Sequence, residues 1–131
     1  MSTLDIDSVL TFSKKAAAKD WKFVDCPVTG SKKQVEAAEL ILLAGAEDKD
    51  LQKMRPLLSR LGKTIVHAGP VGAGTALKLC MNLIVAQMTT GLAEAVALGE
   101  ATGCARKTSL KCCATVPPWI AATSELRGRR F

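Results

Sequence analysis

The sequence predicts an α/β fold, because short runs of strand-forming residues alternate with segments of helical periodicity along its first half. A single long apolar helix is predicted to follow them. The chain has 131 residues, of which 48% are hydrophobic. That is enough for one globular core and leaves little room for a second complete domain.

The first predicted elements are a helix and a strand. Asp5 is a cap-like acid, and the apolar spacing after it suits a helix that ends near Lys19. Residues 21–25 form a short β-rich run. Pro27 and Gly30 follow this run, so we expect a strand and then a turn.

Two further strands and a helix are predicted before residue 70. Residues 40–44 are a continuous apolar run that ends at Gly45, which predicts a fully buried strand. Asp48 is expected to cap the next helix, and residues 64–67 to form the third strand. The apolar residues predicted on one face of that helix are Leu51, Met54, Leu57, Leu58 and Leu61.

The long helix is predicted from Gly74 to about Thr102, where no proline or clear breaker occurs. It would be roughly 40 Å long at about 1.5 Å per residue. Its apolar run 79–98 is long enough to suggest a membrane span, but it contains Asn82, Gln87 and Glu94, so we expect a buried helix and no membrane. The remaining chain is too short to cover it, which predicts a missing domain or a partner subunit.

The net charge of +6 is concentrated at the end of the chain, and the body is nearly balanced. This distribution argues against a general basic surface for nucleic acid. The positive residues at the end are Arg106, Lys107, Lys111, Arg127, Arg129 and Arg130.

The cysteine pattern predicts reduced thiols in the cytoplasm and no metal site. The number of cysteines is odd, no secretory signal pattern precedes them, and none of their spacings is typical of zinc ligands. The five are Cys26, Cys80, Cys104, Cys112 and Cys113.

Two groups of residues carry possible chemistry. Lys78 and Asn82 follow the turn Gly72-Ala-Gly74 and lie four residues apart on one predicted helix face. A lysine there can exchange a proton with a substrate oxygen, while an asparagine amide can orient that oxygen or the lysine. The alternative is an ordinary solvated lysine, but the surrounding helix is apolar, which makes these two residues polar exceptions on a surface suited to burial.

The second group is the strand end and turn over residues 25–33, which contain Thr29, Gly30 and Ser31. Backbone amides freed by such a turn, together with the Thr29 hydroxyl, could bind a carboxylate. The alternative is a simple strand-to-helix loop with a serine or threonine cap.

Together these groups resemble a known family. Residues 25–31, Asp-Cys-Pro-Val-Thr-Gly-Ser, look like the substrate-binding motif Asp-Ala-Pro-Val-Ser-Gly-Gly of 3-hydroxyisobutyrate dehydrogenase and its β-hydroxyacid dehydrogenase relatives, which include proteins similar to 6-phosphogluconate dehydrogenase. Residues 72–82 are similar to their catalytic Gly-x-Gly-x-x-x-Lys-x-x-Asn-Asn. The continuation Gly-Ser-Lys-Lys looks most like the glyoxylate and succinic semialdehyde reductase branch. The resemblance runs from about residue 2 to Gly103.

The resemblance implies an NAD(P)-dependent oxidoreductase that transfers a hydride between nicotinamide and a small hydroxy acid or aldehyde acid. It implies that Lys78 is the general acid/base and Asn82 its hydrogen-bonding partner, while Thr29, Gly30 and Ser31 bind the substrate carboxylate. Ser2 and Thr3 match the Ser-Thr that lies near the nicotinamide in this family. NAD and NADP both stay open as the cofactor.

The resemblance also implies an architecture. Residues 1–69 would be the C-terminal part of a Rossmann-like NAD(P)-binding domain, and residues 70–103 the first long helix of an all-α domain. No Gly-x-Gly-x-x-Gly follows a strand near the start, so we expect the pyrophosphate-binding turn to be absent and the chain alone to be inactive. Family members run to roughly twice this length, and the full-length parent is expected to form a homo-oligomer.

Residues 104–131 are expected to form an irregular tail, since they contain adjacent cysteines and prolines and lack a helical period. Allowed codons for residues 104–123, read one nucleotide earlier, can encode a proline-acid helix start followed by apolar spacing. This suggests a frameshifted stretch, which the nucleotide sequence would test.

Two other interpretations stay open. One is a non-enzymatic relative used for interaction, against which the presence of Lys78 argues. The other is an unrelated small α/β binding module, which would leave the lysine, the asparagine and the turn unexplained.

Overall fold

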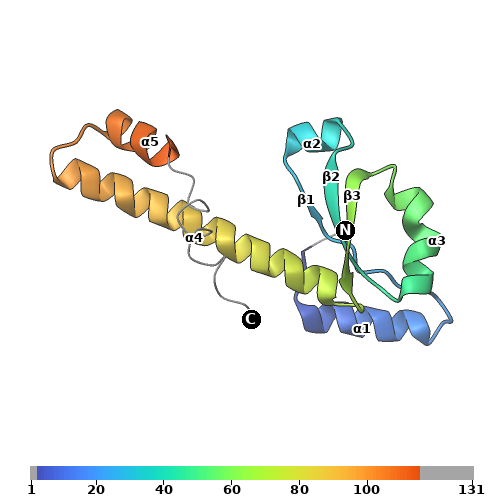
Figure 1. Cartoon of the computed structure of the whole chain (residues 1–131). Coiled ribbons are helices and arrows are strands. Elements are labelled where there is room, and N and C mark those ends of the chain that lie inside the picture. Colours follow the sequence, from blue (N-terminus) through green and yellow to red (C-terminus); the bar gives the residue numbers. More distant parts are fainter. Residues whose placement is uncertain (1–2, 116–131) are drawn as a thin grey trace, which may run out of the picture. The chain divides into compact units, whose positions relative to one another are not determined.

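The computed structural model describes residues 3–115 of the chain (Figure 1). The predictions for Ser2 and for residues 116–131 therefore lie outside the described residues. The chain divides into two compact units, Met1–Asn82 and Leu83–Phe131, which are described in turn.

The first unit opens with helix α1 (Ile6–Ala17), which confirms the predicted helix. Asp5 is its N-cap: one carboxylate oxygen accepts a hydrogen bond from the Ser8 amide at 2.8 Å and the other accepts one from the Ser8 hydroxyl at 2.6 Å. These bonds hold the pKa of Asp5 below its ordinary value. Val9 is the buried residue of this helix.

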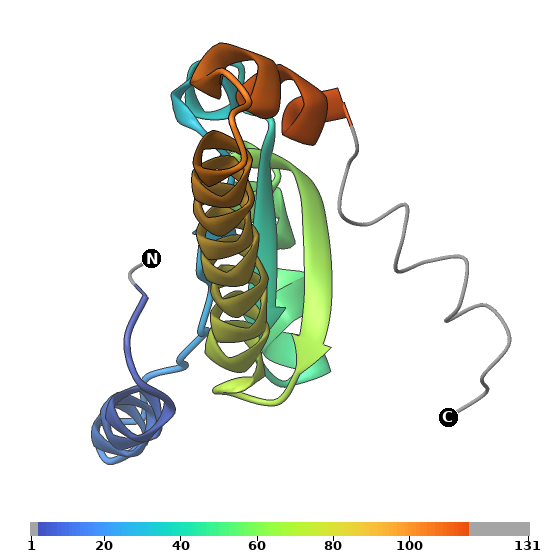
Figure 2. The ribbon, with the colours of Figure 1, turned by 90° about the vertical axis from the view of Figure 1, so that its left-hand side faces the viewer.

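The sheet of the first unit has three strands in the order β1-β2-β3, where β1 is Val28–Thr29, β2 is Leu40–Gly45 and β3 is Gly62–Gly69. β1 pairs antiparallel with β2, while β2 and β3 run parallel, side by side (Figure 2). The predicted second and third strands are confirmed. Four buried residues in a row end β2, as its apolar run predicted.

The predicted strand over residues 21–25 is wrong. Pairing with β2 begins only at Asp25, which forms an isolated antiparallel bridge with Gly45, and continues at Val28 and Thr29. A run of β-forming residues becomes a strand only where a partner strand lies beside it. Here the hydrogen bonds to β2 are made by residues 25–29 instead of residues 21–24.

Two short helices flank the sheet segments. α2 (Lys32–Glu36) lies in a polar stretch for which no helix was predicted. α3 (Asp48–Leu58) matches a predicted helix, but its N-cap is Glu47 rather than Asp48. Of the apolar face predicted for α3, Leu51 and Leu58 are buried, whereas Leu57 and Leu61 are exposed. The buried core around these elements comprises Cys26, Leu42, Ala44, Ala46, Leu51 and Leu58.

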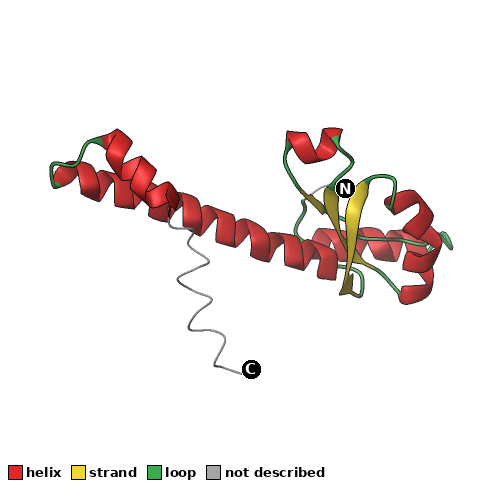
Figure 3. Cartoon of the chain, turned by 45° about the horizontal axis from the view of Figure 1, so that its top comes forward, coloured by secondary structure: helices red, strands yellow, loops and turns green. Residues whose placement is uncertain are grey.

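The long helix α4 (Ala73–Ala101) confirms the predicted element to within one residue at each end. It begins in the first unit and continues into the second; Figure 3 shows it as one unbroken helix. Among the described residues it is the one helix long and apolar enough to cross a membrane, and only 6% of its most apolar window is buried. Leu83 and Leu98, for example, are 62% and 68% exposed.

The second unit ends, within the described residues, with helix α5 (Arg106–Thr115), so the prediction of an irregular tail is wrong for this part. α5 packs on α4 where Gly99 faces Ser109: a Cβ on Gly99 would lie 2.4 Å from the Ser109 hydroxyl oxygen. Ser109 is buried, and the Arg106 guanidinium donates hydrogen bonds to both Glu100 oxygens at 2.8 and 3.0 Å. These contacts stabilise a helix that has no amphipathic pattern of its own.

Candidate active site

The turn between β3 and α4 depends on two glycines with positive φ. Gly69 has a φ of 128° and Gly72 a φ of 96°, conformations that residues with a side chain rarely adopt. Between them, the Pro70 carbonyl accepts a hydrogen bond from the Ala73 amide at 3.0 Å. The turn thus directs the chain from the end of β3 straight into the first turn of α4.

Gly74 lets the start of α4 touch the sheet backbone directly. A Cβ at this position would lie 2.3 Å from the Leu43 carbonyl oxygen and 3.1 Å from the Asp25 carbonyl oxygen. Gly45 faces it, and a Cβ there would lie 2.8 Å from the Gly74 amide nitrogen. Both glycines of this contact are therefore required by close packing.

Asp25, the first residue of the motif 25–31, is hydrogen-bonded to the start of α4. One carboxylate oxygen accepts a hydrogen bond from the Thr75 amide at 2.7 Å, and the other accepts one from the Thr75 hydroxyl at 2.8 Å. Asp25 is 6% exposed and Thr75 is fully buried. A carboxylate at a helix N-terminus satisfies a free amide and interacts favourably with the helix dipole.

Lys78 lies three residues after Thr75 and is half-buried, while Asn82 lies one turn further on and is exposed. Within residues 3–115 neither side chain makes a hydrogen bond or an ion pair with another residue. The structure thus places both on successive turns of α4, as their spacing requires, but shows no bond between them.

Thr29, Gly30 and Ser31 connect β1 to α2. Gly30 has a φ of 144°, and Ser31 is the N-cap of α2. The Gln34 side-chain oxygen accepts hydrogen bonds from the Ser31 amide, at 2.9 Å, and from the Ser31 hydroxyl. Ser31 therefore acts here as the cap of a strand-to-helix loop, and a carboxylate could use these two donors only after displacing Gln34.

Within residues 3–115, no hydrogen bond or ion pair joins the two groups of predicted site residues. The described part of the chain has no hydrogen bond between the segment 29–31 and either Lys78 or Asn82, and Thr3 is exposed near the chain start. What joins the two groups is Asp25 and Thr75, and Thr75 was not singled out from the sequence. The available signals were an acidic residue, Asp25, that opens the motif 25–31, and a hydroxyl residue directly after Gly74.

The start of α4 does not fit a cofactor pyrophosphate, although it is a glycine-flanked helix N-terminus. Bound phosphates need free amides and open space beside the glycines. Here the Asp25 carboxylate already accepts from the Thr75 amide, and the sheet backbone fills the space at Gly74. Another negative group at this end of α4 would be repelled.

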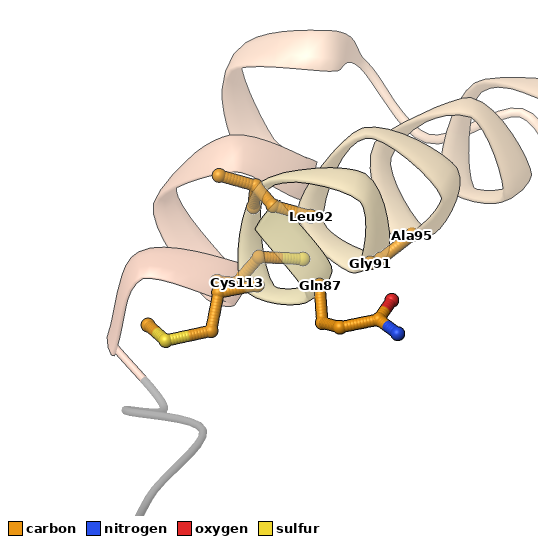
Figure 4. Close-up of a pocket in the computed structure, with 7 residues that line it drawn as sticks. Gln87, Gly91, Leu92, Ala95 and Cys113 are labelled. Atoms are coloured by element: carbon orange, nitrogen blue, oxygen red, sulfur yellow. The ribbon is translucent and has the colours of Figure 1, made fainter. Parts of the chain in front are cut away.

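A separate cavity of about 650 Å³ lies in the second unit, between α4 and α5 (Figure 4). Gln87, Gly91, Leu92 and Ala95 of α4 line it together with Cys113 of α5. It contains none of the predicted site residues and is mostly apolar; its polar groups are the Gln87 amide and the thiols of Cys112 and Cys113.

The chain is similar in sequence to a known family of dehydrogenases. The family described as the NAD binding domain of 6-phosphogluconate dehydrogenase matches residues 1–69. The chain is 41% identical over 103 residues to 2-(hydroxymethyl)glutarate dehydrogenase from Eubacterium barkeri, covering 79% of this chain and 34% of that protein. It is 34% identical over 110 residues to glyoxylate/succinic semialdehyde reductase 1 from Arabidopsis thaliana, covering 84% of this chain and 38% of that protein.

One solved structure is similar to this chain in both fold and sequence. The structure of 3-hydroxyisobutyrate dehydrogenase from Mycobacterium tuberculosis with L-serine aligns with a TM-score of 0.74 at 32% identity, covering 79% of this chain and 36% of that one. The chain thus spans about a third of the length of its relatives. Its fold is the Rossmann-like domain fragment followed by a long helix that the sequence predicted, and the chain belongs to the β-hydroxyacid dehydrogenase family.

Proposed function

We propose that this chain is part of an NAD(P)-dependent oxidoreductase that transfers a hydride between nicotinamide and a small hydroxy acid or aldehyde acid. The observation that carries the proposal is Lys78, a half-buried lysine one helical turn beyond a helix start that is anchored to the sheet. A lysine on a rigid element is suited to hold and move a proton at one defined substrate oxygen.

The roles of the remaining residues follow the family resemblance. Thr29, Gly30 and Ser31 bind the substrate carboxylate, and Asn82 orients Lys78 or the substrate oxygen. Displacement of the Gln34 side chain from Ser31 by the carboxylate would free the amide and hydroxyl of that residue for binding. Ser2 and Thr3 lie near the nicotinamide in this proposal.

The substrate is proposed to be a small carboxylate that carries a hydroxyl or aldehyde group. The names of the relatives include 2-(hydroxymethyl)glutarate, L-serine, 3-hydroxyisobutyrate, glyoxylate and succinic semialdehyde. The Gly-Ser-Lys-Lys sequence favours glyoxylate or succinic semialdehyde, whereas overall identity is higher to the 2-(hydroxymethyl)glutarate enzyme. All five therefore belong in the substrate test.

The 131-residue chain by itself is proposed to be inactive, because no Gly-x-Gly-x-x-Gly occurs in it and the start of α4 cannot take its place. We also propose that the full-length parent is a cytoplasmic homo-oligomer without nucleic-acid, membrane or metal partners. Purified chain that oxidises NADPH in the presence of glyoxylate or succinic semialdehyde would overturn the proposed inactivity.

A chimera tests the function itself. The 103 aligned residues of the Eubacterium barkeri 2-(hydroxymethyl)glutarate dehydrogenase would be replaced by those of this chain. Oxidation of NADH and NADPH would be followed with the aldehydes glyoxylate and succinic semialdehyde, and reduction of NAD⁺ and NADP⁺ with the three hydroxy acids. We expect turnover with at least one of these five substrates. Lys78→Ala should lower kcat about 10²- to 10⁴-fold, the usual contribution of general acid–base catalysis, with little change in cofactor affinity.

The matched control is Lys53→Ala, which removes an exposed lysine of α3 far along the chain from the motifs. Its kcat should equal that of the parent chimera. Turnover that survives Lys78→Ala would refute the role given to Lys78, whereas a chimera that turns over none of the five substrates would overturn the proposed function.

A further inference from the structure

The hydrogen bonds between Asp25 and Thr75, here named the Asp25–Thr75 link, connect residues 50 positions apart in the sequence. We infer that this link is a positioning device, which sets where Lys78 stands relative to the substrate-binding segment 29–31. The inference rests on the proposed function. It assigns to Asp25 and Thr75 a role in the reaction although neither contacts the substrate.

Asp25 is excluded from direct chemistry by its surroundings. It is 6% exposed, and each of its carboxylate oxygens accepts a hydrogen bond from the fully buried Thr75. A carboxylate oxygen can accept a second hydrogen bond, but the burial of Asp25 leaves this carboxylate little access to a substrate. Asp25 is therefore a positioning residue.

Both ends of the link are fixed. The Asp25 amide donates to the Gly45 carbonyl at 2.9 Å, and the Gly45 amide donates to the Asp25 carbonyl at 2.7 Å, so this residue is held to the sheet. At the other end, Gly74 packs against the carbonyl oxygens of Leu43 and Asp25, where no side chain could fit. The start of α4 therefore has little freedom to slide or rotate on the sheet.

The two groups of the proposed site start from this fixed point. Thr29 lies four residues after Asp25, about 13 Å along an extended chain. Lys78 lies three residues after Thr75, about 4.5 Å along the helix axis. The segment from Asp25 to Thr29 keeps one antiparallel register along β2, and Lys78 lies on a helix. Because the two segments meet at the same pair of side chains, the link contributes to setting the distance between the lysine and the proposed carboxylate-binding turn.

A purely local cap would behave differently. If the carboxylate served only to satisfy the Thr75 amide, loss of the threonine hydroxyl would loosen the first turns of α4 and leave β1 unaffected. If the link positions one segment against the other, a substitution in the helix must also change the amide exchange of Thr29 and Gly30.

The first test uses the 131-residue chain and amide hydrogen exchange measured by NMR. Thr75→Val removes one hydrogen bond and keeps the side-chain shape, while Thr75→Ser keeps both donors. We expect Thr75→Val to speed exchange about tenfold at residues 28–31 as well as at the start of α4. Thr75→Ser should exchange like the wild type, and so should Thr89→Val, which removes a hydroxyl that bonds only to its own helix.

The second test measures kinetics in the chimera. Thr75→Val should lower kcat about tenfold to a hundredfold, as expected for a misplacement of about 1 Å, and raise KM for the carboxylate substrate but not for the cofactor. Thr75→Ser should restore kcat to within about twofold. Asp25→Ala should lower kcat as Thr75→Val does, and the double variant should lower kcat little more than either change alone.

The outcomes separate the two proposals. Exchange that changes only in α4 in the Thr75→Val chain overturns the positioning role, whatever the chimera does. If the chimera turns over none of the substrates, the proposed function fails, and the exchange experiment still decides whether the link connects the two segments. An unchanged kcat in the Thr75→Val chimera, with Lys78→Ala inactive, rejects the positioning role alone.

Discussion

At the scale of single residues, Gly74 and Gly91 of α4 differ in whether a side chain could replace them. A Cβ on Gly74 would lie 2.3 Å from the Leu43 carbonyl oxygen, whereas a Cβ on Gly91 would meet nothing within 4 Å. The first glycine is required by backbone contact. The second lies in a helix interior, where glycine is entropically unfavourable.

This contrast gives a paired prediction. Gly74→Ala should lower the free energy of unfolding by about 3 kcal/mol or more, since the backbone must shift to accept the methyl group. Gly91→Ala should raise it by about 0.5–1 kcal/mol through helix propensity. Urea denaturation followed by circular dichroism measures both, and equal midpoints for the two variants would contradict the packing described at Gly74.

Cys26 should differ from the other cysteines in reactivity. Burial raises the pKa of the Cys26 thiol above its ordinary value of 9.0, and the neighbouring Asp25 charge adds to the shift. Less thiolate therefore forms at any given pH below that value, and access is poor. Cys80, Cys104 and Cys112 are exposed.

With 5,5′-dithiobis(2-nitrobenzoic acid) at pH 8, we expect the exposed thiols to react at least about tenfold faster than Cys26. Addition of urea should remove the difference. In Cys26→Ser the slow phase should disappear, and a slow phase that persists in this variant would show that another thiol is the protected one.

At the scale of elements, local sequence signals predicted α1, β2, α3, β3 and α4, because each has a cap or a periodicity of its own. The short elements were harder to predict. β1 has two residues and is set by its pairing with Leu42 and Ile41, and α2 is stabilised by the contact between Gln34 and Ser31. α5 was missed because its stability comes from α4 rather than from its own sequence.

The contact between α4 and α5 should depend on pH. The hydrogen bond from Arg106 holds the pKa of Glu100 below its ordinary value of 4.5, and Glu100 holds the pKa of Arg106 above its own. A carboxyl group with a lowered folded pKa stabilises the folded state above its unfolded pKa. This contribution is lost as the pH falls through the lowered value.

Amide exchange in α5, measured between pH 6 and pH 3 with correction for intrinsic rates, should therefore show less protection toward the acid end. Glu100→Gln should weaken protection at pH 6 and remove this pH dependence. Asp5→Asn is the control, because the Asp5 pKa is also lowered but its effect belongs to α1. An α5 whose protection is independent of pH in the wild-type chain would refute the role of Glu100.

At the scale of the whole molecule, the second half of α4 has more apolar surface than residues 3–115 cover. Large side chains exposed on it are Leu83, Ile84, Val85, Leu92 and Leu98. Exposed apolar surface of this extent is typical of a site that another chain or domain covers.

We therefore expect the chain to self-associate, with a sedimentation coefficient that rises with concentration. The double variant Leu83→Glu and Leu98→Glu should weaken association, whereas Leu57→Glu, an equally exposed leucine of α3, should not. A wild-type chain that sediments as a monomer at all concentrations would contradict this predicted self-association.

The sequence by itself determined α1, β2, α3, β3, the long helix α4 and the two motifs, because these depend on neighbours along the chain. Only the tertiary structure decided that Asp25 bonds to Thr75, that Gly74 touches the sheet, and that Gln34 occupies the Ser31 donors. It also decided which leucines of α3 are buried. The physical reason is that these features depend on how the elements pack. A hydrogen bond between residues 50 positions apart, or the lack of room for one methyl group, cannot be predicted from local periodicity.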